Sequence, residues 1–224
     1  MYQRQEPIGT HGKNIQVING KQQFDYVGQG VEIKNIKLQV PGFHNIANTI
    51  AGITACLLVG LSPEMVKEAV ENFKGVRRRF EYLVESEEKI YIDDYAHHPS
   101  EISSFLKSVK NLYPTKKITA IFQPHLFSRT RDFMDGFAES LALADELLLM
   151  EVYPARELPI EGITSQVLFD KIDMNHKKLL TKEVILEKIG EIKNEVIVTI
   201  GAGNIDTLRN SIKEQLRNVY ITNQ

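Results

Sequence analysis

The densest group of reactive side chains lies in the segment DDYAHHPSE, residues 93–101, directly after an apolar stretch that predicts a strand. Two carboxylates, one phenol and two imidazoles crowd together there as Asp93, Asp94, Tyr95, His97 and His98. A carboxylate can accept hydrogen bonds from ribose hydroxyls, and a histidine can bind an anion or move a proton near neutral pH. Polar residues on a loop held by a rigid scaffold are often functional, so this loop is the first candidate site.

Two other interpretations of this loop stay open. In the first, Ser100 caps the following helix and the acids are simply solvated. In the second, the loop holds zinc, with His125 as a third imidazole beside His97 and His98. Adjacent histidines seldom bind one ion together and no cysteine lies near, so the zinc interpretation is the weaker one and we expect no metal ligands here.

A second candidate loop is QPHLFSRTR, residues 123–131, which follows the next apolar stretch. Arg129 and Arg131 flank Thr130 at what the pattern predicts to be the start of a helix. Positive charge opposes the helix dipole at that end, so a bound anion is the simplest reason for two arginines there. A solvated helix start is the alternative. A third basic segment, RRRFE at residues 77–81, lies in a polar stretch, residues 73–86, that we interpret as a link to a separate unit. There it could carry a cation toward a ligand or form a solvated turn.

The segment EPIGTHGKNIQV, residues 6–17, resembles the start of a phosphate-binding loop. Gly12 and Lys13 fit that pattern, but Pro7 has no N–H to give and Asn14 stands where a magnesium-binding hydroxyl belongs. The following residues indicate a strand, an Asn-Gly turn and another strand rather than a helix. We therefore interpret this segment as a surface loop before a hairpin, and it alone gives no reason to assign ATPase activity.

Composition places the chain among ordinary globular proteins, with 224 residues, 42% hydrophobic and 25% charged. The net charge of −2 offers no basic field for nucleic acid, so small anionic ligands are the better match. The single Cys56 excludes a disulfide within the chain and predicts a buried thiol in a reducing compartment. No leader or membrane span is evident, and we expect a soluble, cytoplasmic protein without membrane or nucleic-acid partners.

The hydrophobic pattern predicts an α/β protein of two domains, residues 1–74 and 75–224. Short alternating segments over residues 15–40 indicate antiparallel strands, and a helix pair follows, with Ser62 as a cap, Pro63 at the first helical position and Gly60 closing the first helix. From residue 89 strands and helices alternate, which predicts a Rossmann-like, mostly parallel sheet covered by helices on both faces. Ligands of such sheets collect at the carboxyl ends of the strands. Four polar loops meet that edge: residues 93–101, 123–131, YPARELP at 153–159 and GAGN at 201–204.

Five segments together resemble the Mur ligase family of peptidoglycan synthesis. They are GFHNIAN (42–48), GVRRRFE (75–81), DDYAHHPSE (93–101), FQPHLFSRTRDF (122–133) and VIVTIGAGNID (196–206). The resemblance implies a C-terminal Rossmann-like ligase domain preceded by the end of a central ATPase domain, in which antiparallel strands lead into a helix pair. It also implies an ATP-dependent reaction: the muramoyl carboxylate of UDP-N-acetylmuramate is phosphorylated, and the amine of L-alanine attacks the acyl phosphate.

By position, the resemblance also implies roles for individual residues. The residues expected to bind the nucleotide are His44, Asn45, Asn48, Arg79 and Asp94. Those expected near L-alanine and the acyl phosphate are Tyr95, His97, Arg129 and Arg131, with His97 and Arg129 as catalytic residues. Leu126 stands where some members of the family have another arginine.

The resemblance further implies parts that the chain lacks. These are the UDP-sugar domain and most of the central domain, including the expected ligands of Mg²⁺. We therefore expect a portion of the ligase that is inactive alone and needs those domains as partners. Two alternatives stay open: a non-catalytic module that binds a nucleotide or an amino acid, and the related ligase that recycles murein tripeptides.

Overall fold

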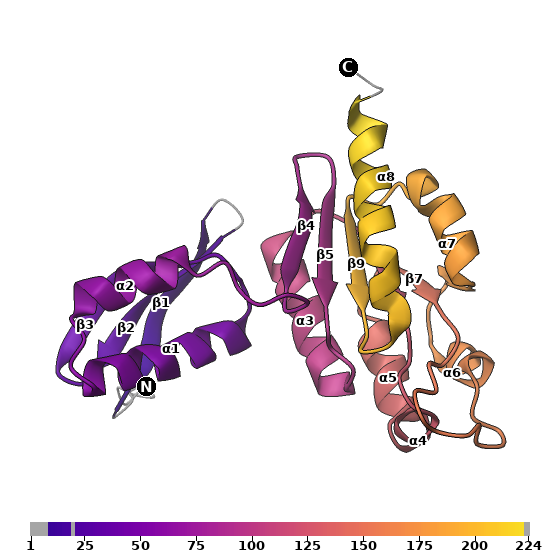
Figure 1. Cartoon of the computed structure of the whole chain (residues 1–224), viewed down its shortest axis with the longest axis horizontal. Coiled ribbons are helices and arrows are strands. Elements are labelled where there is room, and N and C mark those ends of the chain that lie inside the picture. The colour runs from indigo at the N-terminus through magenta and orange to yellow at the C-terminus, as the bar shows by residue number, and fades with distance from the viewer. Residues whose placement is uncertain (1–8, 19–20, 222–224) are drawn as a thin grey trace, which may run out of the picture. The chain divides into compact units, whose positions relative to one another are not determined.

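The computed structural model describes residues 9–18 and 21–221, without the side chains of residues 43, 44 and 218–221. The chain forms two compact units, Met1–Gly75 and Val76–Gln224. Figure 1 shows both units.

The first unit is an antiparallel three-stranded sheet in the order β1-β2-β3, packed against two helices. The hairpin turn between β2 and β3 uses Gln29 and Gly30, both with positive φ, as the Gly28–Gly30 signal predicted. Ser62 caps the second helix, Pro63 begins it, and Gly60 follows the first helix with φ 89°, all three as predicted. The elements are β1 (His11–Ile18), β2 (Lys21–Gly28), β3 (Val31–Leu38), α1 (Phe43–Leu58) and α2 (Pro63–Asn72).

Part of the segment that resembles the start of a phosphate-binding loop belongs to this sheet. Gly12 and Lys13 lie within β1, where they pair with Tyr26 and Asp25 of β2, so the prediction of a surface loop was wrong for these two residues. A Cβ atom on Gly12 would lie 3.0 Å from the side chain of Ile50 in α1, so a glycine there lets helix and strand pack closely. The Lys13 ammonium pairs with a carboxylate of β3 rather than pointing into a phosphate cradle. Pro7 and the Asn-Gly turn at 19–20 lie outside the described residues.

The core of the first unit lies between the sheet and the helices. Phe24, Tyr26 and Ile36 of the sheet are fully buried against apolar residues of α1 and α2 such as Ile53 and Val66. Each such side chain contributes about 1.5–3 kcal/mol when it leaves water. Cys56, predicted to be buried, is a free thiol that is only half-buried at the margin of this core.

The second unit is built on a six-stranded sheet in the order β4-β5-β9-β6-β7-β8. All neighbouring strands are parallel except the β4–β5 pair, so the sheet is mostly parallel, as predicted. Every residue of β5, β6 and β9 is buried, which explains why these strands are mostly apolar. Their buried polar residues are Asp93, Asp94, Thr119 and Thr199. The strands are β4 (Glu81–Glu85), β5 (Ile90–Asp94), β6 (Ile118–Phe122), β7 (Glu146–Leu149), β8 (Lys177–Leu179) and β9 (Val196–Ile200).

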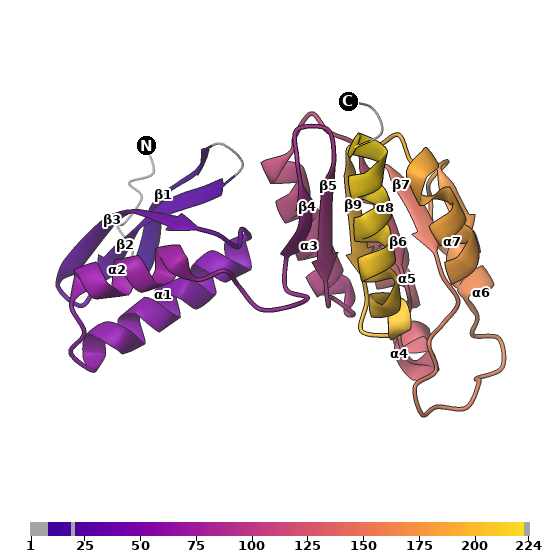
Figure 2. The same ribbon diagram turned by 45° about the horizontal axis from the view of Figure 1, so that its top comes forward.

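Helices cover both faces of this sheet, which confirms the predicted architecture. Figures 1 and 2 show α7 and α8 over one face and α3 and α5 over the other. On the α7–α8 face, Ile185, Ile212 and Leu216 pack against strand residues such as Ile197. The helices are α3 (Pro99–Leu112), α4 (Phe127–Asp132), α5 (Met134–Leu141), α6 (Ser165–Lys171), α7 (Lys182–Lys188) and α8 (Arg209–Ile221), with 3₁₀ turns at Ile189–Glu191 and Asn204–Leu208.

Two segments of this unit differ from the sequence prediction. The segment around residues 73–86, interpreted as a link, contains β4, an edge strand antiparallel to β5. The single helix expected from Thr130 to Ala144 is divided into α4 and α5 at Phe133, whose backbone (φ −122°, ψ 24°) leaves the helical region. Helical periodicity continues across that break, so the apolar pattern does not reveal it.

Candidate functional site

The strand order creates a switch point at the carboxyl edge of the large sheet, where open α/β sheets have their ligand crevice. β9 lies between β5 and β6, and it leads into α8 on one face of the sheet, whereas β5 and β6 lead into helices on the other face (Figure 2). Loops that leave adjacent strands toward opposite faces separate, and ligands of open α/β sheets bind at such switch points. The loops after β5, β9 and β6 therefore form the candidate site.

Arg79, Tyr95 and His97 lie together at the end of β5. The Arg79 guanidinium lies 5.4 Å from the centre of the Tyr95 ring, and the Arg78 guanidinium lies 5.0 Å from it. The His97 ring meets the same tyrosine edge-on, with 5.4 Å between the ring centres. Cation–π contacts of this kind hold guanidinium groups in place while leaving their N–H donors free. The structure thus brings together three residues that sequence analysis assigned to the site.

Asp94 supports this group through the backbone. One carboxylate oxygen accepts the N–H of Phe80 at 2.8 Å and the other accepts the N–H of Ala96 at 2.8 Å. Arg78 and Phe80 both have positive φ, a costly conformation for such side chains, and the Asp94 bond helps to fix the turn that presents Arg79. Burial raises the pKa of Asp94 to about 6, despite the two N–H donors and the nearby Arg79 charge.

Asp93, its neighbour, faces the interior. The carboxylate is fully buried and accepts the Thr199 hydroxyl at 2.6 Å and the Arg78 Nε–H at 3.1 Å. Arg209 Nε lies 2.9 Å from the same carboxylate as an ion pair, although its N–H is not aligned for a hydrogen bond. Arg209 also pairs with Glu81 on β4. This buried network fixes Arg78, whose Nη2 donates to the carbonyl of the residue after β9, and so joins the β5 and β9 loops.

His98 caps a helix rather than lining the crevice. Its backbone begins α3, and its Nδ1 accepts the Ser100 N–H at 3.3 Å, so the cap is His98 and not Ser100. Glu101 completes the cap by accepting the N–H groups of His97 and His98. Burial alone would raise the pKa of Glu101, but these N–H donors and the His97 and Arg79 charges lower it overall. The same bonds hold the His97 backbone.

The prediction that two arginines start a helix was wrong. α4 has six residues, and Arg129 and Arg131 lie in its last turn, where positive charge suits the helix dipole. Arg131 is exposed and its Nε donates to Asp132 at 2.8 Å. The helix dipole therefore gives no reason to expect a bound anion here. Whether Arg129 can bind one depends on the position of its side chain.

Arg129 points to His125. Its Nη1 donates to the Nδ1 of His125 at 3.3 Å, and the His125 ring stacks on Tyr153 with 5.7 Å between ring centres. Burial lowers the pKa of His125, the positive charges of Arg129 and His97 lower it further, and Glu157 acts in the opposite direction. His125 is therefore neutral at pH 7 and can accept from Arg129.

The three other residues assigned to nucleotide binding belong to the first unit. His44, Asn45 and Asn48 lie in the first turns of α1, and Asn45 and Asn48 share a face because they are three positions apart. The Asn45 side chain donates to the Pro41 carbonyl at 2.8 Å, and Asn48 is exposed.

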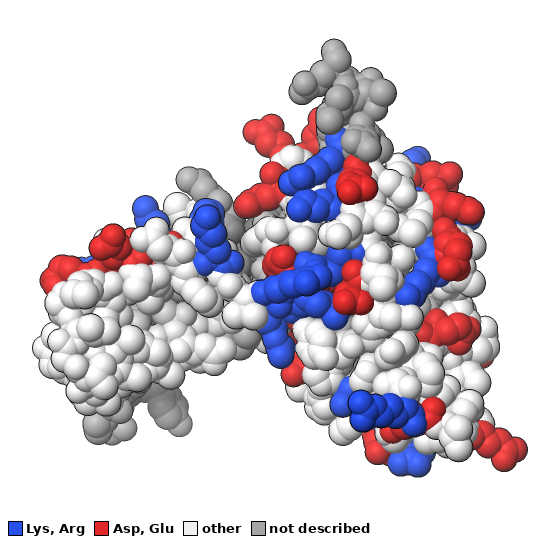
Figure 3. Space-filling view, in the orientation of Figure 1, with Lys and Arg blue, Asp and Glu red and all other residues white. Residues whose placement is uncertain are grey.

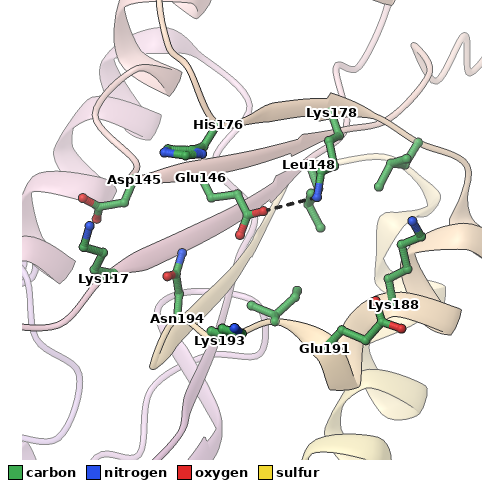
Figure 4. Close-up of a pocket in the computed structure, with 12 residues that line it drawn as sticks. Lys117, Asp145, Glu146, Leu148, His176, Lys178, Lys188, Glu191, Lys193 and Asn194 are labelled. Carbon is green, nitrogen blue, oxygen red and sulfur yellow. Dashed lines mark ion pairs between the residues drawn. The ribbon is translucent and has the colours of Figure 1, made fainter.

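Charged residues also gather elsewhere on the second unit. Figure 3 shows basic side chains near the carboxyl end of β5, with a few acidic ones among them. At the opposite edge, the amino ends of β6, β7 and β8 border a hollow of about 340 Å³ (Figure 4). There Glu146 pairs with Lys178 at 3.8 Å and accepts the Thr119 hydroxyl, and Asp145 accepts the Ile118 N–H. Those bonds tie strand ends together, so we place the site at the carboxyl edge.

Across residues 9–18 and 21–221, no group of three His, Cys, Asp or Glu side chains could hold a metal ion. The described helices include none that is long and apolar enough to cross a membrane.

Sequence analysis missed several residues of the crevice. Gln123 joins two loops, since its amide donates to Asn204 and accepts the Ile205 N–H. Tyr153 and His125 came from segments already noted as polar loops, so their shared sheet edge was a usable signal. Arg209 had no such signal, because it lies in a helix 116 residues after Asp93, its ion-pair partner, and only the fold brings the two together.

A mostly parallel sheet with a polar crevice at its switch point defines a Rossmann-like ligand-binding domain. The chain belongs to the Mur ligase family: residues 78–203, all in the second unit, match its "Mur ligase, glutamate ligase domain". Over 201 residues it is 47% identical to the UDP-N-acetylmuramate–L-alanine ligase of Cytophaga hutchinsonii, covering 90% of this chain and 43% of that protein. The ligase of the same name from Flavobacterium johnsoniae is 46% identical over 203 residues, 91% of this chain and 45% of that protein.

A solved structure of similar fold is the UDP-N-acetylmuramate–alanine ligase of Thermotoga maritima, with a TM-score of 0.73 and 28% identity. The similarity covers 96% of this chain and 46% of that structure. The chain thus spans a little under half the length of the relatives it matches, and the matching part is their C-terminal portion.

Proposed function

We propose that this chain is the C-terminal part of an ATP-dependent ligase that joins L-alanine to UDP-N-acetylmuramate in the cytoplasm. The observation that carries the proposal is that two groups lie at the same edge of the sheet, on either side of β9, in a chain 47% identical to a ligase of that name. One group is Arg79, Tyr95 and His97 at the end of β5, and the other is His125 and Arg129 after β6. The rest of the enzyme, with the UDP-sugar site and the phosphate loop, is its partner.

In this proposal the crevice of the second unit serves the incoming amino acid and the acyl phosphate. Arg129 neutralises charge that develops on the phosphate, and Tyr95 borders the amino-acid site. Arg131 is the weaker member of the arginine pair, because its guanidinium already bonds to Asp132. His97 accepts a proton from the ammonium of L-alanine, and the amine that results attacks the acyl phosphate. The Nδ1 of His97 donates to the Tyr95 carbonyl at 3.0 Å, so Nε2 of this half-buried ring is the nitrogen that accepts the proton.

Five residues are assigned to the nucleotide in this proposal. Asn45 and Asn48, with His44 beside them, meet the adenine, while Arg79 and Asp94 serve the ribose and phosphate region. Asp94 acts in part through the backbone of the Arg79 turn. ATP is a substrate of the proposed reaction. Gly12 and Lys13, which resemble part of a phosphate-binding loop, lie in a strand, so the described residues do not supply the loop that binds the ATP phosphates. Mg²⁺, which would neutralise the phosphates, has its ligands in the rest of the enzyme.

A chimera tests the proposal: the matching part of the Cytophaga hutchinsonii ligase is replaced by this chain, and phosphate release is measured with Mg-ATP, UDP-N-acetylmuramate and L-alanine. We expect release that depends on L-alanine, and none from this chain alone. His97→Gln should lower turnover about a hundredfold, as loss of a general base does, with little change in ATP affinity. Lys110→Gln, on the exposed side of α3, is the matched control. A folded chimera that binds ATP but releases no phosphate with L-alanine would contradict the proposal.

A further inference from the structure

The loop between β7 and α6, residues 150–164, contains the YPARELP segment that the proposed function leaves unused. The loop borders a hollow of about 530 Å³ against Phe127 of α4. Leu158, a large apolar side chain of this loop, is 85% exposed. Met150 and Val152 at the start of the loop are buried, but no residue from 153 to 164 is, so polar contacts must place that part of the loop.

Tyr153 attaches this loop to the β6–α4 loop, residues 123–126. Its N–H donates to the Pro124 carbonyl at 2.8 Å, and its carbonyl accepts the Leu126 N–H at 2.9 Å, as in a short parallel bridge. Its ring stacks on His125. Leu126 has φ 72°, which is unfavourable for a side chain of its size, so the surrounding contacts must hold it there.

Glu157 makes a second attachment four residues later. One oxygen of its carboxylate accepts the Ser128 N–H at 2.9 Å, and the other accepts the Ser128 hydroxyl. These bonds, the hydroxyl first, lower the pKa of Glu157, so it stays charged at neutral pH. Ser128 directly precedes Arg129 in a helix of six residues, and so short a helix is not stable by itself.

We infer that Glu157 is a positioning residue for the β6–α4 loop: with Tyr153, it holds α4 so that Arg129 and His125 face the anion of the reaction. The inference rests on the proposed function for what Arg129 binds. The contacts that define it are independent of that function, because they join residues of the second unit alone. The β7–α6 loop thereby supports the residues of the substrate site without contacting the substrate itself.

The first test compares Glu157→Gln with Glu161→Gln in the whole chain by NMR. Glu161 is an exposed carboxylate of the same loop. In Glu157→Gln we expect the Ser128 amide signal to shift and the pKa of His125 to fall. The pKa falls because burial, Arg129 and His97 still lower it while the opposing Glu157 charge is gone. Glu161→Gln should leave both unchanged. If a folded Glu157→Gln chain keeps both wild-type values, the inference is wrong.

The second test titrates the Arg129 side-chain signals with inorganic phosphate. We expect roughly tenfold weaker binding in Glu157→Gln, the equivalent of about one charge-assisted hydrogen bond, and an intermediate loss in Ser128→Ala, which keeps the N–H contact. Unchanged phosphate affinity alongside shifted Ser128 and His125 signals would overturn the positioning role. If phosphate does not shift the Arg129 signals of the wild-type chain, the proposed role of Arg129 in binding the anion is wrong. The Ser128 and His125 signals then still test whether Glu157 attaches the β7–α6 loop to α4.

Discussion

Replacing Asp93 with asparagine removes a negative charge from the buried centre of the second unit. The wild-type carboxylate is fully buried and lies within 3.1 Å of a nitrogen of both Arg78 and Arg209. The side chains of Arg78 and Arg209 are only 12% and 5% exposed, respectively, so water cannot solvate their guanidinium groups in place of the lost carboxylate. Among the carboxylates of the described residues, Glu81, with 30% of its side chain exposed, is then the one that still pairs with Arg209.

The expected cost is therefore that of leaving buried cations uncompensated, about 3–5 kcal/mol in the free energy of unfolding. With a urea m-value of about 2 kcal/mol per molar, the midpoint should fall by roughly 1.5–2.5 M. The assay is urea unfolding followed by NMR signals of β9 amides, which report on the second unit alone. Asp173→Asn, at an exposed position, is the matched control and should change the midpoint little.

A second variant separates charge from packing. Adding Arg209→Met to the Asp93→Asn chain removes one of the two buried guanidinium groups that faced Asp93. It should restore part of the lost stability, because apolar replacements of buried ion pairs are often tolerated. A loss below about 1 kcal/mol in Asp93→Asn would refute the reasoning, since it would mean that the arginines find other partners or water. No recovery in the double variant would show that the loss comes from packing.

Two further predictions concern the same edge of the sheet. The pKa of Asp94 is about 6 in the folded unit and 3.8 in the unfolded chain, so the folded unit binds the proton more tightly. The free energy of unfolding should therefore fall by up to about 3 kcal/mol as pH rises from about 4 to about 6. Asp94→Asn should lack this decline in urea midpoints, and parallel pH profiles would contradict it. Gly201→Ala places a Cβ 2.8 Å from the Gln123 carbonyl oxygen at φ 144°, and should cost about 2–3 kcal/mol. Gly162→Ala, with φ 76° and nothing within 4 Å, should cost only about 1 kcal/mol, and equal costs would exclude the clash.

The sequence predicted the sheet and its helices because their signals are local. Continuous apolar runs such as Val196–Ile200 can only be buried strands here, and Ser62 with Pro63 marks a helix start within two residues. β4 escaped prediction because a five-residue edge strand with a bulge lacks strict alternation. The break at Phe133 left the helical period intact, so periodicity could not show it.

The candidate site was predictable only as far as its loops. Tyr95, His97 and Arg129 were found because polar residues follow strands whose carboxyl ends must share one edge. The direction of each side chain was not predictable. His98 forms a cap and Arg131 pairs with its neighbour, although both are chemically equal to the residues that enter the crevice. Arg209 could not be connected with Asp93 before the fold was known, because contacts of such sequence separation depend on strand order.

The two open edges of the large sheet bear on how the protein behaves at high concentration. A strand with an unpaired side can pair with another molecule and begin aggregation, and natural sheets prevent this with short, charged or bulged edges. β8 has only three residues, two of them Lys177 and Lys178. β4 has a register irregularity between Tyr82 and Val84 and a glutamate at each end. Each edge thus resists addition of a further strand, and the sheet can present its polar crevice without recruiting other copies of itself.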